Sequence, residues 1–546
     1  MHLVDFYNFK PPADLIVVRD ESQAMRVQAA KTSLVRRARV AQHAPRRAPR
    51  LEPPAANRPP PPPPPARAPR CAQEFRRNAF NTDSVDEALD TLDFCYKIVS
   101  RSGLSDNGTY LPKAIHPKYN CIAPKTSIDD AMEEARMVIC GAIDGLLKKQ
   151  GLAAKDIDVL ITTCSVFCPT PSLASLVVNH FGMRPDVQSY HLGGMGCSNG
   201  VVAVNLVNDI LGSRRNVNAI LLTTEITTPA FYKGTDKHRQ VTNMLFRTGA
   251  NAALFSNRRR MAARAKYALT RNVRVHLAAR DPAYKCIWWG PDAEGNNGIY
   301  LGKDVVNEAS RGLSMAMFKV APSILSVGQI AAYAATEASR RLLGSKAPPY
   351  KPRFAECVDH FLIHAGGAKV LDGIGKELQL DDAALEPSRA VLHDYGNISS
   401  STTWYTLGFV ESVRGVRRGE RLLQIGVGSG IKCGVNVWTA LRDIHDVQDA
   451  WAHRATDPSV LRARRGRASA VAALLRVLLF AVVAALALHW ALGAGLLAEY
   501  EPTLAPLVAP VAKALAPVGE ALAPLAAPVA AALEPVAERV RGLLQG

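Results

Sequence analysis

Short, nearly continuous apolar runs constrain the fold of this chain more than any other feature of its sequence. Three of them lie in its first half, DIDVLITTCSV, NAILLTTEI and NAALFSN, and two more lie in its second half, HFLIHAG and RLLQIGVGSG. Apolar runs without polar alternation are typical of strands that helices bury on both faces. Helical patterns separate these runs from Thr82 to about residue 445. Two similar halves with sites at strand ends therefore predict a layered α/β fold.

The N-terminal part of the chain has a different composition. Residues 1–20 predict a short ordered segment, whereas residues 21–80 form an Arg/Pro-rich segment that we expect to be extended or disordered. The start, MHLVDFYNFKPP, is too polar for a cleavable signal peptide. The net charge of +18 is concentrated in arginine blocks. No aromatic interleaving or nucleic-acid-binding motif accompanies these blocks, so they favour a solvated or membrane-surface role over nucleic-acid binding.

A long apolar stretch near the C-terminus predicts a transmembrane helix at 477–498, preceded by a basic linker at 446–476. The stretch carries no formal charge, and its length suits a bilayer at about 1.5 Å per residue. A buried core helix is the alternative. The residues that follow, 499–546, are an Ala/Pro-rich low-complexity tail. The positive-inside rule places the globular part in the cytosol, because five arginines precede the stretch, namely Arg462, Arg464, Arg465, Arg467 and Arg476.

Cys197 lies in HLGGMGCSNGVVAVNLVNDIL, between glycines and an apolar run that predicts a largely buried helix. The positive end of a helix dipole favours a thiolate at this position, and glycines allow another group to approach closely. A buried structural thiol is the alternative interpretation. The ten cysteines form no paired framework, which indicates reduced thiols. Cys164 and Cys168 have no further ligand at zinc-site spacing, so no metal site is predicted.

In three further stretches, reactive side chains lie close to glycines in the sequence. HFLIHAGG places His360 and His364 four residues apart, with His364 at a strand end. HDYGNISSSTTW places His393 and Asn397 four residues apart, before a serine/threonine run that opens a helix. IGVGSGIKCG is a glycine-rich turn that could bring Gly428 close to a substrate. A single histidine is more often structural than catalytic, so each stretch alone is a weak signal.

Taken together, GGMGCSNG, HAGG, GNISSSTTWY and GVGSGIKC follow the order found in thiolase-fold condensing enzymes. With LVDFYNFKPP, RSGLSDNGTYLP, FCPTPSLASLVVNHF and NMLFRTGANAALFSN, the chain resembles the plant-type 3-ketoacyl-CoA synthases of very-long-chain fatty acid elongation. The resemblance covers most of residues 1–12 and about 82–440. It implies a thiolase-like fold of two similar α/β halves, at 81–265 and 266–445, in α/β/α/β/α layers.

The resemblance also implies roles for individual residues. Cys197 corresponds to the nucleophile of the family, and His364 and Asn397 correspond to the other members of its triad. The backbone N–H groups of Cys197 and Gly428 correspond to its oxyanion hole. The remaining implied positions are three supporting histidines and a phenylalanine near the acyl entrance, namely His276, His360, His393 and Phe246. No metal or cofactor is implied.

In the implied reaction, the cysteine takes an acyl group from a long-chain acyl-CoA as a thioester. Malonyl-CoA then loses carbon dioxide, and two hydrogen-bond donors stabilise the enolate that attacks the acyl-cysteine. The product is a 3-oxoacyl-CoA two carbons longer. From the family we expect a homodimer at the endoplasmic reticulum membrane with its catalytic part in the cytosol. We also expect it to work with a ketoreductase, a dehydratase and an enoyl reductase, and without nucleic acid.

Two departures from the family pattern concern the membrane topology. The family usually has two hydrophobic helices before LVDF, whereas this sequence starts at Met1 just ahead of that motif, and the segment at 21–80 is foreign to the pattern. Either the first part is missing or the C-terminal stretch provides the anchor. The alternatives for function are a type III polyketide synthase and a catalytically inactive membrane scaffold. Hydroxymethylglutaryl-CoA synthase chemistry would need a glutamate near the nucleophile, and SYHLGGMGCSNG has none.

Overall fold

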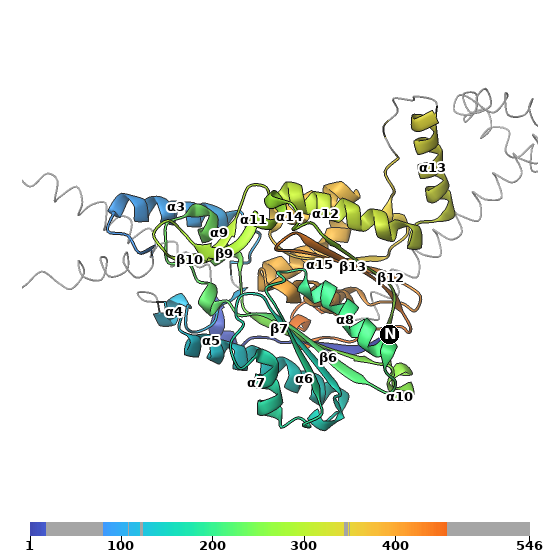
Figure 1. The fold of residues 1–546 in the computed structure, drawn as a ribbon, viewed down its shortest axis with the longest axis horizontal. Coiled ribbons are helices and arrows are strands. Elements are labelled where there is room, and N and C mark those ends of the chain that lie inside the picture. The colour runs from blue at the N-terminus through green and yellow to red at the C-terminus, as the bar shows by residue number, and fades with distance from the viewer. Residues whose placement is uncertain (18–79, 107–108, 121–123, 343–347, 349, 456–546) are drawn as a thin grey trace, which may run out of the picture. The chain divides into compact units, whose positions relative to one another are not determined.

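The computed structural model describes residues 1–17, 80–106, 109–120, 124–342, 348 and 350–455 (Figure 1). Almost all of the predicted Arg/Pro-rich segment, the basic linker beyond residue 455, the predicted membrane span at 477–498 and the tail lie outside these residues. Among the described helices, none has both the length and the apolar character that crossing a bilayer requires.

The described strands form one large sheet, with the order β11-β12-β13-β8-β1-β7-β6-β4-β5, and two small two-stranded sheets, β9 with β10 and β2 with β3. In chain order the strands are β1 His2–Asn8, β2 Ile16–Val17, β3 Thr109–Tyr110, β4 Val159–Cys164, β5 Gln188–Gly193, β6 Asn218–Glu225, β7 Gly249–Ser256, β8 Tyr267–His276, β9 Ile287–Pro291, β10 Asn297–Leu301, β11 His360–Ile363, β12 Arg421–Gly428 and β13 Lys432–Ala440.

Helices surround and divide this sheet. They are α3 Val85–Ser100, α4 Pro117–Asn120, α5 Ile128–Ala135, α6 Gly141–Gln150, α7 Leu173–Phe181, α8 Asn199–Ser213, α9 Lys237–Leu245, α10 Arg259–Ala262, α11 Asp281–Lys285, α12 Val305–Val320, α13 Val327–Leu342, α14 Ala368–Leu378, α15 Asp382–Tyr395 and α16 Thr402–Phe409.

The large sheet repeats one strand pattern in its two sections. In one section β4 and β6 run parallel and β7 returns antiparallel beside β6. In the other section β11 and β12 run parallel and β13 returns antiparallel beside β12. Strand β1 joins the sections, because it pairs with β7 from His2 to Asn8 and with β8 at His2 and Leu3. The predicted α/β fold is therefore confirmed. The sheet is mixed, and hydrogen bonds between neighbouring strands run through both of its sections.

Two apolar helices, α8 and α16, lie between the sections of the sheet. Helix α8 contacts β4 and β6 as well as β12 and β13, and every residue of α16 is buried. The Asn436 side chain donates to the Val201 carbonyl over 3.0 Å, and the Trp404 indole donates to the Gly200 carbonyl over 3.0 Å. The first six residues of α8, 199–204, are buried like the whole of α16, as expected for apolar helix segments inside a large core. The sequence of these helices therefore places the start of each one deep inside the protein.

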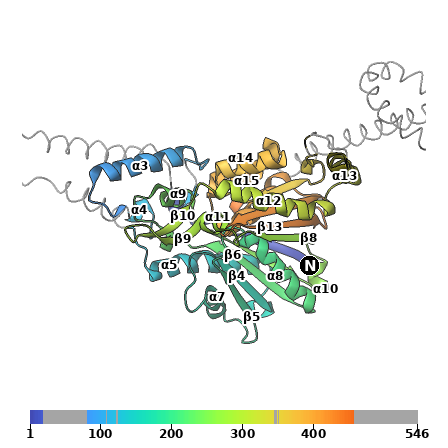
Figure 2. The same cartoon turned by 45° about the horizontal axis from the view of Figure 1, so that its top comes forward.

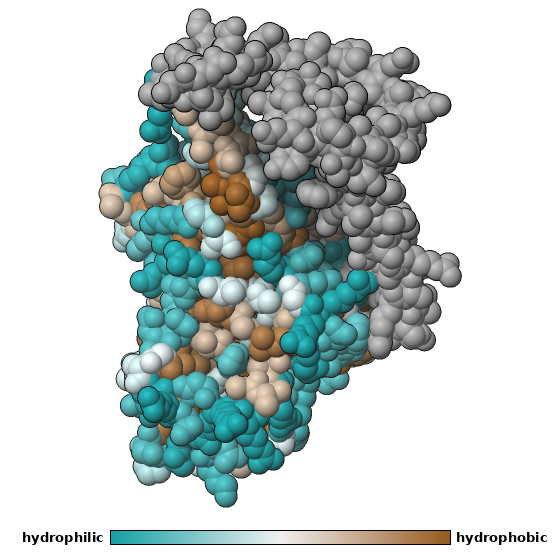
Figure 3. All heavy atoms as spheres, turned by 90° about the vertical axis from the view of Figure 1, so that its right-hand side faces the viewer, coloured by the Kyte–Doolittle hydropathy of each residue, from teal (hydrophilic) through white to brown (hydrophobic). Residues whose placement is uncertain are grey.

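Other helices cover the outer faces of the sheet (Figure 2). Helices α6 and α7 pack on the β4, β5, β7 and β1 side, whereas α12, α14 and α15 gather on the side of β8, β13 and β11. Apolar patches interrupt the hydrophilic surface on the face shown in Figure 3. Helices α12 and α13 carry several of the large apolar side chains that are exposed in the described chain, namely Val306, Met315, Phe318, Val327 and Ile330.

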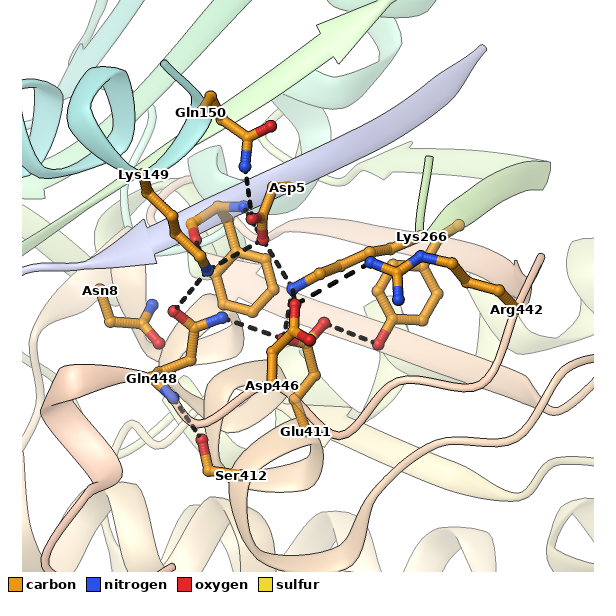
Figure 4. Close-up of polar contacts among 12 residues, drawn as sticks. Asp5, Asn8, Lys149, Gln150, Lys266, Glu411, Ser412, Arg442, Asp446 and Gln448 are labelled. Carbon is orange, nitrogen blue, oxygen red and sulfur yellow. Dashed lines mark hydrogen bonds and ion pairs between the residues drawn. The ribbon is translucent and has the colours of Figure 1, made fainter. Parts of the chain in front are cut away.

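A buried ammonium group ties the N-terminal strand to both sections of the sheet (Figure 4). The Nζ atom of Lys266 lies 2.6 Å from Asp5 Oδ1, 2.8 Å from Glu411 Oε2 and 2.8 Å from Asp446 Oδ2. Burial by itself would lower the pKa of Lys266, but the three carboxylates raise it, so the amine keeps its charge. These carboxylates are close enough together to ligate a cation. The Lys266 ammonium supplies the positive charge at their centre.

Neutral and charged donors complete this cluster. The Tyr267 hydroxyl donates to Glu411 Oε1 over 3.0 Å, and the Gln448 amide donates to Glu411 Oε2 over 2.9 Å. Lys149 and Gln150, at the end of α6, donate to the two Asp5 oxygens over 3.1 and 2.7 Å. Because each carboxylate has several donors, the cluster is stable although it is buried.

We expect Lys266→Met to destabilise the protein strongly, because it leaves three buried carboxylates without their shared cation. The free energy of unfolding should fall by about 3–5 kcal/mol, measured by denaturant titration. The matched control is Lys285→Met, which removes the exposed pair with Asp281 and should change that free energy by less than about 0.5 kcal/mol. Equal effects of the two substitutions would contradict a central role for the Lys266 cluster.

Candidate active site

Cys197 lies two residues before the first residue of α8, at a point where two loops meet backbone to backbone. A Cβ atom at Gly428 would lie 2.7 Å from the Cys197 nitrogen and 2.6 Å from the Ser198 nitrogen. Gly196 has a φ of +73°, and a Cβ atom there would overlap the Ser429 backbone. Only glycine permits this approach. The glycine-rich turn and the cysteine loop are therefore in direct contact, with the Gly428 backbone against the Cys197 nitrogen.

Ser399 contacts all three members of the predicted triad. Its φ of +50° is unusual for a residue other than glycine. Its side chain is near enough to the Cys197 thiol to lower the pKa of that thiol, and its backbone is near enough to the His364 ring to raise the pKa of the ring. Its N–H donates to Asn397 Oδ1 over 2.8 Å. Thus the structure brings Cys197, His364 and Asn397 together around one buried serine.

The orientation of the Asn397 amide follows from its hydrogen bonds. Oδ1 accepts from the Ser399 N–H, and Nδ2 donates to the Gly366 carbonyl over 3.2 Å. The backbone of Asn397 is held as well, because its N–H donates to Leu245 O and its carbonyl accepts from Arg247 N, each over 3.0 Å. The amide therefore presents a fixed NH₂ group, whose second N–H can donate to a ligand.

His364 directly follows β11, beside the glycines of HAGG. Its Nδ1 lies 2.6 Å from the Thr402 hydroxyl, and its Nε2 faces Gly366, where a Cβ atom would lie 3.1 Å away. Burial lowers the pKa of His364 to about 4, so the ring is neutral at neutral pH. Because the Thr402 hydroxyl donates to the Ser399 carbonyl over 2.9 Å, its oxygen accepts from Nδ1–H of the neutral ring, and Nε2 carries the lone pair.

The thiol of Cys197 is protonated at rest. Burial raises its pKa to about 12, the hydrogen bond with Ser399 lowers it, and the charge of Glu225 raises it further. The helix dipole at the start of α8 would by itself favour the thiolate, as the sequence predicts. In the structure the loss of solvation outweighs that dipole, because the thiol is packed among the residues between the two sheet sections. A proton acceptor is therefore needed before Cys197 can act as a nucleophile.

The structure brings two of the other predicted residues near this centre. Phe246 directly follows α9 and forms an isolated bridge with Asn397, and it lines a small cavity of ≈ 30 Å³ with Leu111 and Phe231. His276 ends β8, opposite Lys432, with its Nε2 3.4 Å from the position of a Cβ atom at Gly430. It is therefore on the exposed side of the glycine-rich turn.

The structure does not bring His360 or His393 to Cys197. His360 begins β11, so the length of that strand separates it from His364, and its Nε2 lies 2.8 Å from Glu420 Oε2. His393 lies on α15, half-exposed, 2.6 Å from Asp394 and 3.1 Å from Arg454. Both histidines were placed in the site through the family resemblance. In the structure their rings contact carboxylates instead, Glu420 for His360 and Asp394 for His393.

Sequence reasoning missed three polar residues of the centre, Glu225, Ser399 and Thr402. Glu225 ends the buried strand β6 and accepts a hydrogen bond from the Ser399 hydroxyl over 2.8 Å. The signal was an acidic residue at the end of an otherwise apolar run, in NAILLTTEI, and a serine/threonine run directly after Asn397. Such groups are rarely buried without a polar partner, so they predict a polar centre.

Two family models and several known proteins match this chain. The family described as FAE1/Type III polyketide synthase-like protein matches residues 65–342, and the C-terminal domain of chalcone and stilbene synthases matches residues 355–443. A solved structure, 1,3,6,8-tetrahydroxynaphthalene synthase from Streptomyces coelicolor A3(2), is 22% identical, covers 67% of this chain and 93% of its own, and has a TM-score of 0.48. The matched family descriptions place the chain in the class of FAE1/type III polyketide synthase-like proteins.

Relatives with known names identify one family within this class. Arabidopsis thaliana 3-ketoacyl-CoA synthase 6 is 42% identical over 359 residues, which are 66% of this chain and 71% of the relative. Arabidopsis thaliana 3-ketoacyl-CoA synthase 5 is 41% identical over 363 residues, 66% of this chain and 73% of the relative. The chain belongs to the 3-ketoacyl-CoA synthase family, and the resemblance found in the sequence is confirmed.

We expect Gly428→Ala to destabilise the protein by about 1–3 kcal/mol, because its methyl group would overlap the backbone nitrogens of Cys197 and Ser198. Denaturant titration measures this change. The matched control is Gly212→Ala on α8, where a methyl group meets open space and should stabilise the helix by about 0.5–1 kcal/mol. A neutral Gly428→Ala substitution would contradict the close approach of the two loops.

We expect the stability of the protein to depend on pH through His364. Its folded-state pKa of about 4 lies below the ordinary value of 6.5, so an unfolded chain binds a proton that the folded site excludes. This contribution is complete above pH 6.5 and is lost as the pH falls towards 4, by about 3 kcal/mol at most. Denaturant titrations of wild type and His364→Gln across this range measure it. Parallel pH curves would contradict a buried neutral His364.

Proposed function

We propose that this protein is a very-long-chain 3-oxoacyl-CoA synthase, an acyltransferase that condenses malonyl-CoA with a long-chain acyl-CoA. The observation that carries the proposal is the contact of Ser399 with Cys197, His364 and Asn397 in a chain whose relatives are 3-ketoacyl-CoA synthases. A cysteine, a histidine and an asparagine around one point supply a nucleophile and two hydrogen-bond donors. The names of these relatives favour elongation over polyketide synthesis.

In the first half-reaction the Cys197 thiolate attacks the carbonyl carbon of the acyl-CoA thioester. The tetrahedral intermediate places a negative charge on the former carbonyl oxygen, and the Cys197 and Gly428 N–H groups are the proposed donors to it. The close packing of the two loops supports this assignment. Collapse of the intermediate releases CoA thiolate and leaves the acyl group on Cys197. The exchange of one thioester for another is nearly balanced in energy, which suits a cysteine nucleophile.

In the second half-reaction malonyl-CoA loses carbon dioxide and becomes an enolate. The Asn397 Nδ2–H group and the His364 ring are the proposed donors to its thioester oxygen. Ser399 and Gly366 fix the amide, and Thr402 holds the His364 ring through Nδ1, so that Nε2 donates to this oxygen when it carries a proton. The carbanion attacks the acyl-cysteine, forms the new carbon–carbon bond and releases the Cys197 thiolate. Asparagine suits this role because it donates without taking up a proton.

The finer parts of the proposal rest on the family and the sequence. We propose the five-layered thiolase-like arrangement with two similar halves, a homodimer, and substrates acyl-CoA and malonyl-CoA without a resident cofactor. We also propose attachment to the endoplasmic reticulum membrane through the apolar stretch at 477–498, with the catalytic part in the cytosol. A ketoreductase, a dehydratase and an enoyl reductase would then process the product.

An elongation assay with radiolabelled malonyl-CoA and a panel of acyl-CoAs, in membranes that contain the full chain, tests the proposal. We expect 3-oxoacyl products two carbons longer than the starter with wild type, and none with Cys197→Ala. Asn397→Ala should lower the rate by about 10²–10³, which is typical of a lost oxyanion donor. Cys357→Ala, at a buried thiol before β11, is the control that should retain activity.

Two outcomes would contradict the proposal. Condensation that persists in Cys197→Ala would exclude an acyl-cysteine intermediate at this residue. Products formed only from short or aromatic starters would support the polyketide alternative instead.

A further inference from the structure

The corner between α12 and α13 presents large apolar side chains to solvent. Phe318, in the last turn of α12, is 67% exposed, and Val327, the first residue of α13, is 84% exposed. Met315 and Ile330 lie about one turn away on the two helices and are exposed as well. Figure 1 shows α13 projecting from the rest of the described chain beyond this corner. Exposed apolar patches of this kind mark interaction surfaces.

The corner is fixed from inside the protein. Val320 and Ile324, on either side of the turn, are buried in the core. The Ser323 hydroxyl donates to the Val320 carbonyl over 2.6 Å, and the Arg421 guanidinium donates to the Ile324 carbonyl over 3.2 Å. The fold therefore holds the neighbouring apolar side chains outward, and their exposure does not result from loose packing of the turn.

The backbone of the corner suits an apolar environment. The N–H groups of Ile324 and Leu325 both donate to the Ala321 carbonyl, over 3.1 and 2.9 Å. Pro322, the exposed residue between them and α12, has no N–H group. In hydrocarbon, every backbone polar group needs a partner within the protein. The turn supplies these partners itself, so its apolar side chains can leave water without exposing unpaired N–H groups.

The charges around the corner complement a phospholipid surface. Between Glu308 and Glu337 the chain carries no acidic residue, whereas it carries two basic residues, Arg311 and Lys319. Both basic residues are exposed on α12. Arg311 lies seven residues before Phe318, so the two share one face of the helix. Such cations can reach lipid phosphates while their aliphatic stems lie along the apolar side chains.

The sequence after the described residues keeps the corner within reach of a bilayer. The described chain ends at residue 455, and the apolar stretch that we propose as the membrane anchor begins at residue 477. Residues 456–476 join the two, and a segment of this length spans at most about 75 Å. A globular part that is tethered so closely meets the bilayer surface at high effective concentration. The inference rests on the proposed function in taking this anchor.

We propose that the corner of α12 and α13 is a membrane-binding surface. Phe318 and Val327 enter the interfacial region of a phospholipid bilayer, and Arg311 and Lys319 contact the lipid phosphates. The contact fixes the orientation of the catalytic part on the bilayer. It thereby sets the side from which an amphipathic long-chain acyl-CoA reaches the protein.

Photo-crosslinking of the full chain, in vesicles of equimolar phosphatidylcholine and phosphatidylinositol, tests this surface. Phe318→p-benzoylphenylalanine and Val327→p-benzoylphenylalanine place a photoreactive group at two points of the corner. After irradiation, peptide mass spectrometry should find lipid adducts at both positions. The matched control is Ile128→p-benzoylphenylalanine at the start of α5, which is 70% exposed and lies far from α13 in Figures 1 and 2. It should form no lipid adduct.

The contribution of charge is measured with a second pair of variants. Lys319→Glu, combined with the photoreactive group at Phe318, should lower the yield of lipid adduct by about fivefold, because one basic contact with an anionic surface is lost. In vesicles of phosphatidylcholine alone the yield should change little. Lys148→Glu, at an exposed lysine of α6, is the control that should leave the yield unchanged in both kinds of vesicle.

Three outcomes would overturn the membrane-binding surface. They are the absence of lipid adducts at both corner positions, equal adduct formation at Ile128, and crosslinks to a second copy or to the tail of the chain in place of lipid. Failure of the anchor is detected separately, because alkaline carbonate would then extract the protein from the vesicles. Lipid adducts at the corner would support the surface even if the elongation assay gives no product.

Discussion

The left-handed turn at Ser399 is the constraint on which the active centre depends. It lies between Asn397 and the start of α16, and the adjacent Ser400 carbonyl lies so close to α8 that a Cβ atom at Gly200 would overlap it. A turn in this conformation directs its hydroxyl, N–H and carbonyl to different neighbours. It thereby joins Cys197, the proposed nucleophile in one sheet section, to His364 and Asn397, the proposed donors in the other. The two halves of the molecule meet in a shared polar centre.

The polar centre is surrounded by apolar packing, and this setting decides its chemistry. Burial holds the Cys197 thiol and the His364 ring in their neutral forms, so charges arise only during the reaction. Fixed donors in a dry site stabilise such charges more strongly than water-exposed ones. The buried Lys266 cluster has the opposite character, because its charges are permanent and mutually compensated. The Lys266 cluster holds the two halves together, whereas the polar centre around Ser399 contains the groups proposed to react.

Much of this could be predicted from the sequence. Nearly continuous apolar runs gave the strands, and the motifs of the family gave Cys197, His364, Asn397 and Gly428, which the structure brings together. The motifs assigned His364 to the triad and His360 to a supporting position, and the structure places the two histidines at opposite ends of one short strand. Ser399 and Glu225 could not be assigned, since their roles depend on hydrogen bonds between segments 174 residues apart. Sequence patterns predict where helices and strands lie. Contacts between the two halves can be assigned only once the folded structure is known.

The central claim is that Cys197 carries the acyl group. Peptide mass spectrometry of the full chain, after incubation with a long-chain acyl-CoA and then with malonyl-CoA, tests it most directly. The account predicts an acyl thioester on the peptide that contains Cys197, formed before malonyl-CoA is added and lost afterwards. An acyl group on a different cysteine, or product formation without any acylated Cys197, would contradict it.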